Sequence, residues 1–356
     1  MNRPENNTLP RVVVLYNDSA GLIKGEARDM LAERGVIACA QAVAAALPAA
    51  GYQAALLPFQ GDVEQALAPY SPRDWVIFNL AEGLEGRLFE EARIAWALEA
   101  MGYRFTGADG DALARSTHKA QAKACLAAAG IPTPPWRLFR HPDEVAVAVP
   151  AGSSDPAAGP AATALSFPLI VKPVAEDASL AIGPEAVVHT VQALRERVDY
   201  VVSRYRQAAL AEQFIAGREF NISLWGDPVE VLPLAEVDFA AFADPCQRIV
   251  SFDAKWEADS FAYRHTPVVC PAVVAPALEQ AITAVARRAW AALGCRGYAR
   301  VDIRLAGDGT PYVLEVNCNP DISPDAGFFR AAQTAGYDYT AMVARILEFA
   351  LKAQDE

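Results

Sequence analysis

The chain has 356 residues, of which 53% are hydrophobic and 21% are charged. This length and composition allow two or three domains with their own cores and exclude an intrinsically disordered chain. The formal net charge of −12 argues against nucleic acid as a partner, because an acidic surface repels phosphate backbones.

The N-terminal part of the chain predicts neither export nor a membrane partner. Residues 1–10 are polar, and the apolar run Val12–Tyr16 is too short for a signal sequence or a membrane span. The most apolar helical stretch, Ala38–Ala50, contains Gln41 and Pro48, so we interpret it as a packed helix. Six cysteines without paired spacing indicate reduced thiols rather than disulfides or a zinc site. These features together predict a cytoplasmic protein.

The first part of the chain alternates strands and helices. The predicted strands are Arg11–Tyr16, Gln53–Leu57 and Asp74–Asn79, and Tyr103–Thr106 is a candidate for a further short strand. The predicted helices are Met30–Pro48 and Arg87–Met101. This alternation predicts a parallel α/β sheet in the first ~110 residues.

The second part of the chain is richer in strands. A helix is predicted over His118–Ala129, because Gly130 and prolines follow it, and Pro150–Ala164 predicts a flexible insertion of small residues. The strands expected after it are Phe167–Lys172, Ala209–Gln213, Phe220–Trp225, Val229–Glu236, Tyr298–Leu305 and Pro311–Asn317. The helices expected there are Thr190–Ala208, Ala275–Leu293 and Tyr337–Lys352. This order predicts an α+β region with antiparallel strands.

The most informative motif is a predicted hairpin near the C-terminus. Arg300 and Asp302 share one face of its first strand, and Glu315 and Asn317 share one face of its second strand. If the Gly-Asp-Gly turn at 307–309 closes the hairpin, Asp302 lies opposite Glu315 and Arg300 lies opposite Asn317. The same register places Leu305 near Tyr312.

This hairpin allows two interpretations. Carboxylates and an amide oxygen suit Mg²⁺, a hard cation that also takes phosphate oxygens, and opposed carboxylates repel unless a cation lies between them. The alternative is a solvated polar face with an ion pair to Arg300, which is common in half-exposed antiparallel sheets.

Two lysines and a loop add to a candidate phosphate site. Lys172 ends an apolar strand and can present its ammonium to a phosphate. The alternative is an ordinary lysine at a strand end that binds no ligand. The small residues of Glu176–Gly183 let backbone N–H groups approach phosphate oxygens. Lys255 lies in an irregular stretch and either closes over a terminal phosphate or is a surface lysine.

The segment Ala209–Glu219 is a candidate nucleotide contact. Backbone groups after Glu212 can meet an adenine edge, and Glu219 can take ribose hydroxyls. The alternative is a solvated glutamate at the entry to a strand.

In this order, the lysines, the small-residue loop, the two glutamates and the hairpin resemble the ATP-grasp superfamily, and within it the D-alanine–D-alanine ligases. The similarity runs from about Val12 to the C-terminus. The stretches that carry it are Tyr103–Gly107, Ala129–Pro132, Phe167–Pro173, Glu212–Glu219, Asp253–Trp256, Cys270–Ala272 and Arg300–Pro320.

The resemblance implies a three-domain ATP-grasp fold. Its parts would be an N-terminal parallel α/β domain (1–115), a small central α+β domain (116–211) with a flexible insertion near 141–165, and a C-terminal antiparallel-sheet domain (212–356). It implies an ATP-dependent carboxylate–amine ligase that forms a peptide or amide bond through an acyl phosphate and releases ADP and phosphate. The partners implied are small carboxylates and amines, such as amino acids, and a homodimer by analogy.

The resemblance also implies roles for individual residues. The residues implied for the ATP phosphates are Lys119, Lys172, Ser179 and Lys255. Those implied for adenine and ribose are Glu212, Gln213, Phe214, Ile215 and Glu219. Two Mg²⁺ ions, for which Mn²⁺ is a substitute, would be held by Asp302, Glu315 and Asn317. The catalytic residues would be Lys255 and Arg300, with Arg300 stabilising the oxyanion of the tetrahedral intermediate.

The substrate end departs from the family pattern. The family's E-G-S-S-V-G loop appears as Glu176–Ala181, without one serine and both glycines, and Asn79–Gly83 replaces its L-H-G segment. The family's T-S-P-G appears as Cys318–Asp321, and the serine that holds the substrate carboxylate aligns near Ala326. Trp256 replaces a tyrosine. Because buried polar contacts dominate selectivity for small polar substrates, these changes predict a different acid, amine or both.

Four residues are candidates for the altered substrate site. Glu33 matches the family's N-terminal glutamate that reads an amino group, although the serine that follows it is absent. Trp256 directly follows Lys255. Glu82 and Asp321 are candidates to meet a cationic group, or they are loop acids without a ligand. The alternatives for the whole chain are a true D-alanine–D-alanine ligase of cell-wall synthesis, a non-ligating nucleotide-binding paralogue, and an α/β protein outside the superfamily.

Overall fold

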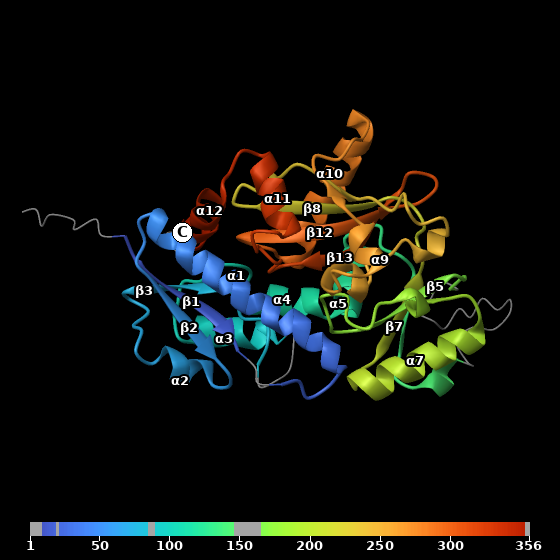
Figure 1. Ribbon diagram of the computed structural model, residues 1–356, viewed down its shortest axis with the longest axis horizontal. Helices are drawn as coiled ribbons and strands as arrows, with labels where there is room; N and C mark the ends of the chain where they lie inside the picture. The colour runs from blue at the N-terminus through green and yellow to red at the C-terminus, as the bar shows by residue number, and fades with distance from the viewer. Residues whose placement is uncertain (1–8, 19–20, 85–89, 146–164, 353–356) are drawn as a thin grey trace, which may run out of the picture.

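The computed structural model describes residues 9–18, 21–84, 90–145 and 165–352. Its strands form a three-stranded, a four-stranded and a six-stranded sheet. Figure 1 shows the three-stranded sheet at the left, the six-stranded sheet in the upper middle and the four-stranded sheet at the right.

The N-terminal sheet is parallel, as the sequence predicts. Strand β1 (Arg11–Asn17) lies between β2 (Ala54–Phe59) and β3 (Trp75–Asn79). Alternate side chains of β1 enter two different cores, one shared with α1 (Met30–Ala49) and the other with α3 (Glu91–Ala100). Burial on both faces explains why β1 is a continuous run of β-branched and aliphatic residues.

Two predictions near this sheet are only partly met. The segment Tyr103–Thr106 forms an isolated bridge between Phe105 and Ile77 rather than a strand. The predicted helix over Arg87–Met101 begins at Glu91 in the structure, and its residues 87–89 lie outside the described residues. The predicted insertion at Pro150–Ala164 also lies outside them.

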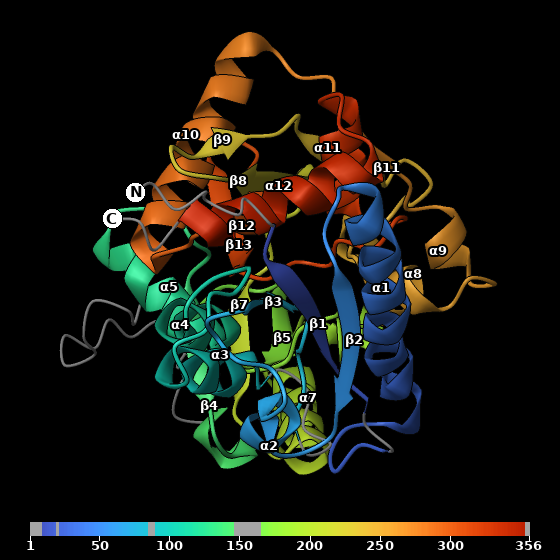
Figure 2. The same ribbon diagram turned by 90° about the vertical axis from the view of Figure 1, so that its left-hand side faces the viewer.

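Helix α1 belongs to a segment, Ala27–Ala49, that is long and apolar enough to cross a membrane by length and composition alone. In the fold it packs against β1, β2 and the C-terminal helix α12 (Tyr339–Lys352), as Figure 2 shows. Ala40, Val43 and Leu47 are fully buried in that contact. The structure therefore packs one face of α1 into a core, in agreement with the packed helix predicted over Ala38–Ala50.

The four-stranded sheet is antiparallel and has the order β4-β7-β5-β6. Its strands are β4 (Trp136–Phe139), β5 (Leu169–Pro173), β6 (Val187–Val188) and β7 (Ala209–Gln213). Helix α5 (Lys119–Ala128) agrees with the predicted helix and reaches the next sheet through its contact with β13.

Helix α7 (Val191–Tyr205) covers this sheet. The Thr190 hydroxyl accepts a hydrogen bond from the Ala193 N–H and so caps the helix start. The predicted helix end at Ala208 is wrong, because Arg206 adopts a left-handed conformation with φ of 54° and ends the helix.

The six-stranded sheet carries the predicted hairpin. Its order is β11-β10-β8-β12-β13, and β9 pairs with the end of β8. The strands are β8 (Glu219–Trp225), β9 (Glu230–Val231), β10 (Ala235–Val237), β11 (Val268–Val269), β12 (Tyr298–Leu305) and β13 (Pro311–Asn317). The single strand predicted over Val229–Glu236 is wrong, because Pro233 interrupts it between β9 and β10.

Helices close the C-terminal region. Helix α10 (Pro276–Leu293) ends at Gly294, whose φ of 73° forms a left-handed cap. Helix α11 (Gly327–Thr334), which the sequence analysis does not predict, packs beside α12. The remaining helical segments are η1 (Ala27–Asp29), α2 (Val63–Leu67), α4 (Gly110–Thr117), η2 (Pro142–Glu144), η3 (Pro184–Ala186), η4 (Pro245–Gln247), α8 (Phe252–Trp256) and α9 (Phe261–Arg264).

Two large hydrophobic cores join the N-terminal sheet to the C-terminal region. One core combines β1 and α3 with β12 and α10, and the other combines β1 and α1 with α11 and α12. The four-stranded sheet has a separate core under α7. The open space between that sheet and the six-stranded sheet is where the candidate site lies.

Candidate active site

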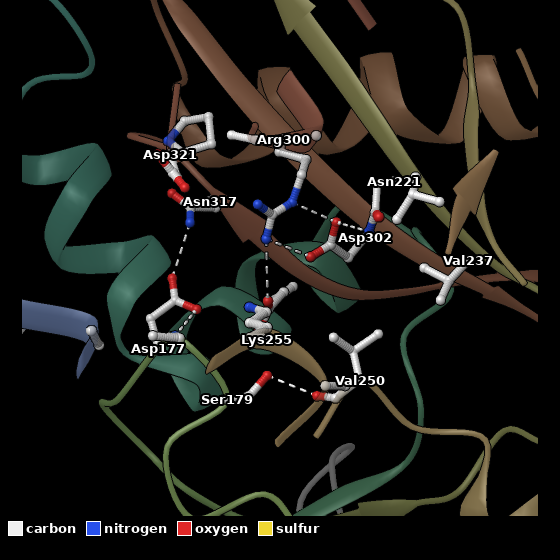
Figure 3. A pocket seen from close by; sticks show the side chains of 18 of the residues that line it. Asp177, Ser179, Asn221, Val237, Val250, Lys255, Arg300, Asp302, Asn317 and Asp321 are labelled. Atoms are coloured by element: carbon white, nitrogen blue, oxygen red, sulfur yellow. Dashed lines mark hydrogen bonds and ion pairs between the residues drawn. The ribbon is translucent and has the colours of Figure 1, made fainter. Parts of the chain in front are cut away.

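A cavity of about 680 Å³ lies between the four-stranded sheet and the six-stranded sheet. Figure 3 shows Arg300, Asp302 and Asn317 of the six-stranded sheet, Asp177 of the loop after β5 and Lys255 of the short helix α8 around it. The predicted site residues that line it are Lys172, Ser179, Glu212, Gln213, Phe214, Ile215, Glu219, Lys255, Arg300, Asp302, Glu315 and Asn317. The predicted substrate residues Glu82, Trp256 and Asp321 also line it.

Two predicted residues are placed differently. Lys119 lines a small pocket beside the cavity, together with Asp177, Glu315 and Asn317. The backbone of Glu33 belongs to α1, and its side chain lies outside the described part of the structure.

The β12–β13 hairpin brings the predicted metal residues face to face. Asp302 pairs with Glu315, and Arg300 pairs with Asn317. A bulge after Asp302 shifts the register by one residue, so Leu305 pairs with Pro311. Leu305 therefore lies near Tyr312, as predicted, but Tyr312 pairs with Arg304, because the extra residue in one strand moves every later partner.

Arg300 is the cation that faces the opposed carboxylates. Its Nε donates to Asp302 Oδ1 at 2.8 Å, and its Nη2 donates to Asp302 Oδ2 at 2.9 Å. Its Nη2 lies 3.9 Å from Glu315 Oε1. The Asn221 amide also donates to Asp302 Oδ1 at 2.8 Å. The ion pair of the alternative interpretation is thus present, but on a buried face rather than a solvated one.

Glu315 lies at the centre of four cations. Although burial raises its pKa, the charges of Lys119, Lys172, Lys255 and Arg300 lower it to about 2. The carboxylate is therefore ionised, with four cations near it. Several cations beside ionised carboxylates suit a polyphosphate carrying a divalent ion.

Lys172 is held by a buried carboxylate. Its ammonium forms an ion pair with Glu212 on the neighbouring strand β7, and Lys123 pairs with the other Glu212 oxygen at 2.5 Å. Lys123 also donates to the Thr133 hydroxyl at 2.8 Å. Burial raises the pKa of Glu212, but the two lysines outweigh it and lower that pKa below its ordinary value.

Lys119 begins α5 and reaches the small-residue loop. Its ammonium donates to the Glu176 carbonyl, and its own N–H donates to the Val174 carbonyl at 2.8 Å. The carboxyl of Glu91 lies nearby and accepts a hydrogen bond from the Thr117 hydroxyl at 2.9 Å. Burial and the charge of Asp177 raise the pKa of Glu91 to about 8, although Thr117 and Lys119 oppose this shift.

The loop Glu176–Gly183 adopts at its centre the left-handed backbone conformation that glycine favours, although no glycine lies there. Ala178, Ser179 and Ala181 have φ of 55°, 60° and 59°, which is the left-handed region. Such a conformation normally costs an L-residue roughly 1–2 kcal/mol. The surrounding contacts therefore hold the loop in this left-handed shape.

Two contacts join this loop to residues 250–256, which we call the lid, and a third joins it to the hairpin. The Trp256 indole donates to the Ala178 carbonyl at 3.0 Å, and the Ser179 hydroxyl donates to the Val250 carbonyl at 2.7 Å. Asn317 Nδ2 donates to Asp177 Oδ2 at 3.0 Å and joins the loop to the hairpin. Lys255, on the short helix α8, thereby points into the cavity.

The far end of the cavity has an apolar wall and a buried glutamate. Ile170, Phe214, Ile215 and Ile249 line it. Glu219 pairs with Arg304 at 2.7 Å, and Arg304 also donates to the Ile215 carbonyl at 2.8 Å. An apolar slot beside a carboxylate suits an aromatic base with an attached polyol.

The near end of the cavity is acidic. Glu82 follows β3, and Asp321 follows β13 and accepts hydrogen bonds from the N–H and hydroxyl of Ser323. Burial, then Cys39, Glu82 and Asp321, raise the pKa of Tyr298 well above its ordinary value, so both acids lie around this tyrosine. Asp325 also lines this end, and Arg330 donates to its carbonyl at 3.3 Å.

Several residues that support the site were not predicted from the sequence. Lys123 lies one helical turn after Lys119, which was a readable signal, because residues four apart share a helix face. Arg304 lies two residues after Asp302 on the same face of β12. Asn221 and Asp177 carried no signal, since only the packing of separate elements brings them to Asp302 and Asn317.

The donors on the hairpin fit a hard divalent cation. Within the described residues, no group of three or more histidine, cysteine, aspartate or glutamate side chains forms a metal cluster. The candidate set instead combines two carboxylates with an amide, and the nearest contact of Glu315 to Arg300 is long at 3.9 Å. Few protein ligands beside several cations fit an ion that completes its shell with phosphate oxygens.

Comparisons with known proteins show which family this chain resembles. A family model described as the D-ala D-ala ligase C-terminus matches residues 125–348. A D-alanine–D-alanine ligase of Chromohalobacter salexigens is 32% identical over 95% of this chain and 93% of its own length. An uncharacterized protein of Sinorhizobium fredii is 31% identical over 87% of each chain.

A solved structure shares the fold. The D-alanine–D-alanine ligase of Bacillus anthracis, in a complex with ATP, superposes with a TM-score of 0.69 at 20% identity, over 98% of this chain and 99% of that one. The chain therefore belongs to the D-alanine–D-alanine ligase family, a family of ATP-dependent ligases with the ATP-grasp fold.

Proposed function

We propose that this chain uses MgATP to join a carboxylate to an amine through an acyl phosphate, in the cavity between its two antiparallel sheets. The observation that carries the proposal is the convergence of Lys119, Lys172, Lys255 and Arg300 on Glu315, opposite Asp302. Phosphoryl transfer is catalysed mainly by such positioned charge, because the transferred group carries its negative charge on three oxygens.

The nucleotide would lie along the cavity. Gln213, Phe214 and Ile215 would contact adenine, Glu219 would take the ribose hydroxyls, and Ser179 would meet the phosphates with its loop. Two Mg²⁺ ions, or Mn²⁺ in their place, would be held by Asp302, Glu315 and Asn317. When bound, these ions would offset the negative charge of the phosphates.

The chemistry follows from where the charges lie. A substrate carboxylate oxygen attacks the terminal phosphorus of ATP, the bond to the bridging oxygen breaks, and ADP leaves. The amine then attacks the acyl carbon, loses a proton and displaces phosphate. Lys119, Lys172 and Lys255 offset the phosphate charge, and Arg300 stabilises the oxyanion. The Trp256 contact to Ala178 keeps the lid closed against water, which hydrolyses acyl phosphates.

We infer that the substrates differ from two D-alanines. Ala326 offers no hydroxyl where the family's serine holds the substrate carboxylate, and Asp321 takes the place of a glycine. Glu82 and Asp321 line the same end of the cavity as Tyr298. Two carboxylates there favour an acid or amine with an additional cationic group, such as a basic amino acid or a diamine. The relatives' names favour D-alanine itself as the second candidate.

The substrate experiment compares D-alanine with cationic substrates. Purified protein with MgATP would be given D-alanine, other amino acids, basic amino acids and diamines, and products would be identified by mass. The proposal predicts turnover with a cationic substrate and a KM that rises about tenfold or more in Glu82→Gln or Asp321→Asn. Asp199→Asn, on the exposed side of α7, is the matched control and should leave KM unchanged.

The alternatives predict other results. Turnover with D-alanine alone, unaffected by the two variants, would support the cell-wall ligase. Nucleotide binding without turnover of any substrate would support the non-ligating paralogue. We also infer that the protein acts in the cytoplasm. A homodimer is proposed only by analogy to relatives.

A further inference from the structure

A second cavity, of about 580 Å³, lies outside the candidate active site. Its walls come from Tyr103–Gly107 after α3, from the loops at 226–229 and 295–297, and from the end of α12 beside α10. Figure 2 shows this end of α12 close to α10. Its size falls within the roughly 300–1,000 Å³ of pockets that hold small molecules.

The backbone of two glycines separates this cavity from the first one. A Cβ atom on Gly297 would lie 3.3 Å from the Gly107 nitrogen, so the two segments touch. A Cβ on Gly107 would lie 3.1 Å from Asn319 Oδ1, and Asn319 belongs to the active-site wall. The two cavities are therefore neighbours with separate linings.

Three cations line the second cavity: Arg104, Arg296 and Lys352. Among the residues that the structure describes, none of the three has an ion pair or a side-chain hydrogen bond. The Arg296 Nε atom is buried without a hydrogen-bond partner, and its guanidinium lies over the Phe105 ring at 4.7 Å. A buried N–H group without a partner costs free energy, so it marks a position that a ligand can satisfy.

The remaining lining offsets these cations only in part. Glu99 and Asp227 also line the cavity, but both are exposed, and neither is among the ion-pair partners of the three cations in the described part of the chain. Unpaired arginines stand out in a chain with a net charge of −12, where carboxylate partners are plentiful. Trp290 and Phe349 add an aromatic wall beside the charges.

We propose that this cavity binds a small molecule carrying two or more oxyanion charges, of phosphate or carboxylate type. Two guanidinium groups match such oxyanions with paired N–H donors, and Lys352 adds a point charge. The aromatic wall would take an apolar part of the same molecule. The proposal does not depend on the proposed ligase activity, because none of these residues belongs to that site.

Calorimetric titration of the full chain with pyrophosphate and with citrate tests the proposal. We expect saturable binding to this cavity, with affinity about tenfold weaker or more in Arg104→Ala/Arg296→Ala. Lys255→Ala, in the active site, should keep the binding. Tighter binding of pyrophosphate than of citrate would identify a phosphorylated ligand. Tighter binding of citrate would identify a polycarboxylate.

Two controls keep the test decisive. Arg140→Ala/Arg195→Ala removes two exposed arginines at β4 and α7 and should keep the binding, which separates a site from general charge. Lys352→Ala, at an exposed helix end, replaces the double variant if the latter fails to fold and should weaken binding several-fold. The proposal is overturned if the wild type shows no saturable binding, or if Lys255→Ala abolishes it while Arg104→Ala/Arg296→Ala does not.

Discussion

Lys172 and Glu212 form an ion pair across the neighbouring strands β5 and β7, with side-chain exposures of 8% and 1%. Lys123 approaches the same carboxylate from α5, so one buried anion orders two buried cations. This arrangement fixes the Lys172 ammonium at the cavity wall before any ligand arrives.

Replacing Glu212 by Gln should strongly destabilise the protein. The change leaves two buried lysines without a counter-charge, and breaking a buried pair from one side typically costs about 3–5 kcal/mol. Urea unfolding would measure the free energy of unfolding. Glu236→Gln, which breaks the more exposed pair with Arg218, is the control and should cost about 1 kcal/mol or less. Equal effects of the two variants would contradict this account.

Replacing Ala181 by Gly should be harmless or favourable. Ala181 is buried with φ of 59°, and glycine adopts this region without the strain of an L-residue, so we expect a gain of up to about 1 kcal/mol. Ala181→Val should destabilise the loop and weaken nucleotide binding, because β-branching disfavours this backbone further.

Ala186→Gly provides the control for that prediction. Ala186 is buried in the helical segment η3, where glycine should cost about 0.5–1 kcal/mol. Thermal unfolding of the variants would rank them. If Ala181→Gly loses as much stability as Ala186→Gly, the left-handed conformation does not strain the loop.

Glu91 should make stability depend on pH. Burial and Asp177 raise its pKa from an ordinary 4.5 to about 8, so the folded state binds the proton more tightly than the unfolded state. The stability of the wild type relative to Glu91→Gln should therefore fall as pH rises between these values, by at most about 1.4 kcal/mol per pH unit.

The prediction for Glu91 is tested by measuring the free energy of unfolding in the absence of nucleotide. Denaturant unfolding at pH 5, 6.5 and 8 would give the difference between wild type and Glu91→Gln at each pH. Glu64→Gln, on an exposed position of α2, reports the effect of removing a surface carboxylate. A difference that stays constant from pH 5 to 8 would show that Glu91 is ionised in the fold throughout.

The sequence predicts the scaffold of the site well. Strict alternation over Arg300–Asp302 and Glu315–Asn317 determines which side chains share a face, and the turn at 307–309 sets their partners. The bulge after Asp302 was not predictable, because nothing in the alternation marks an extra residue. The register is therefore correct on the active-site side of the bulge and shifted beyond it.

Contacts between separate elements could not be predicted from the sequence. The partnership of Lys123 with Glu212 depends on how α5 packs against the four-stranded sheet, and that of Asn317 with Asp177 depends on how the loop packs against the hairpin. The left-handed backbone at Ala181 could not be predicted either, because glycine is the residue that usually marks this conformation. Pro233, in contrast, was a readable break in the strand predicted over Val229–Glu236.

The central claim is that Glu315 and its cations form a MgATP site for ligation. The most direct measurement is release of ADP and phosphate from ATP by the wild type and Glu315→Gln, with the substrate panel, with Mg²⁺ and with EDTA. Asp308→Asn, in the exposed turn of the same hairpin, controls for loss of a carboxylate. The account predicts substrate-dependent release by the wild type and Asp308→Asn, and none by Glu315→Gln or in EDTA. Equal release by Glu315→Gln, or by the wild type in EDTA, would contradict it.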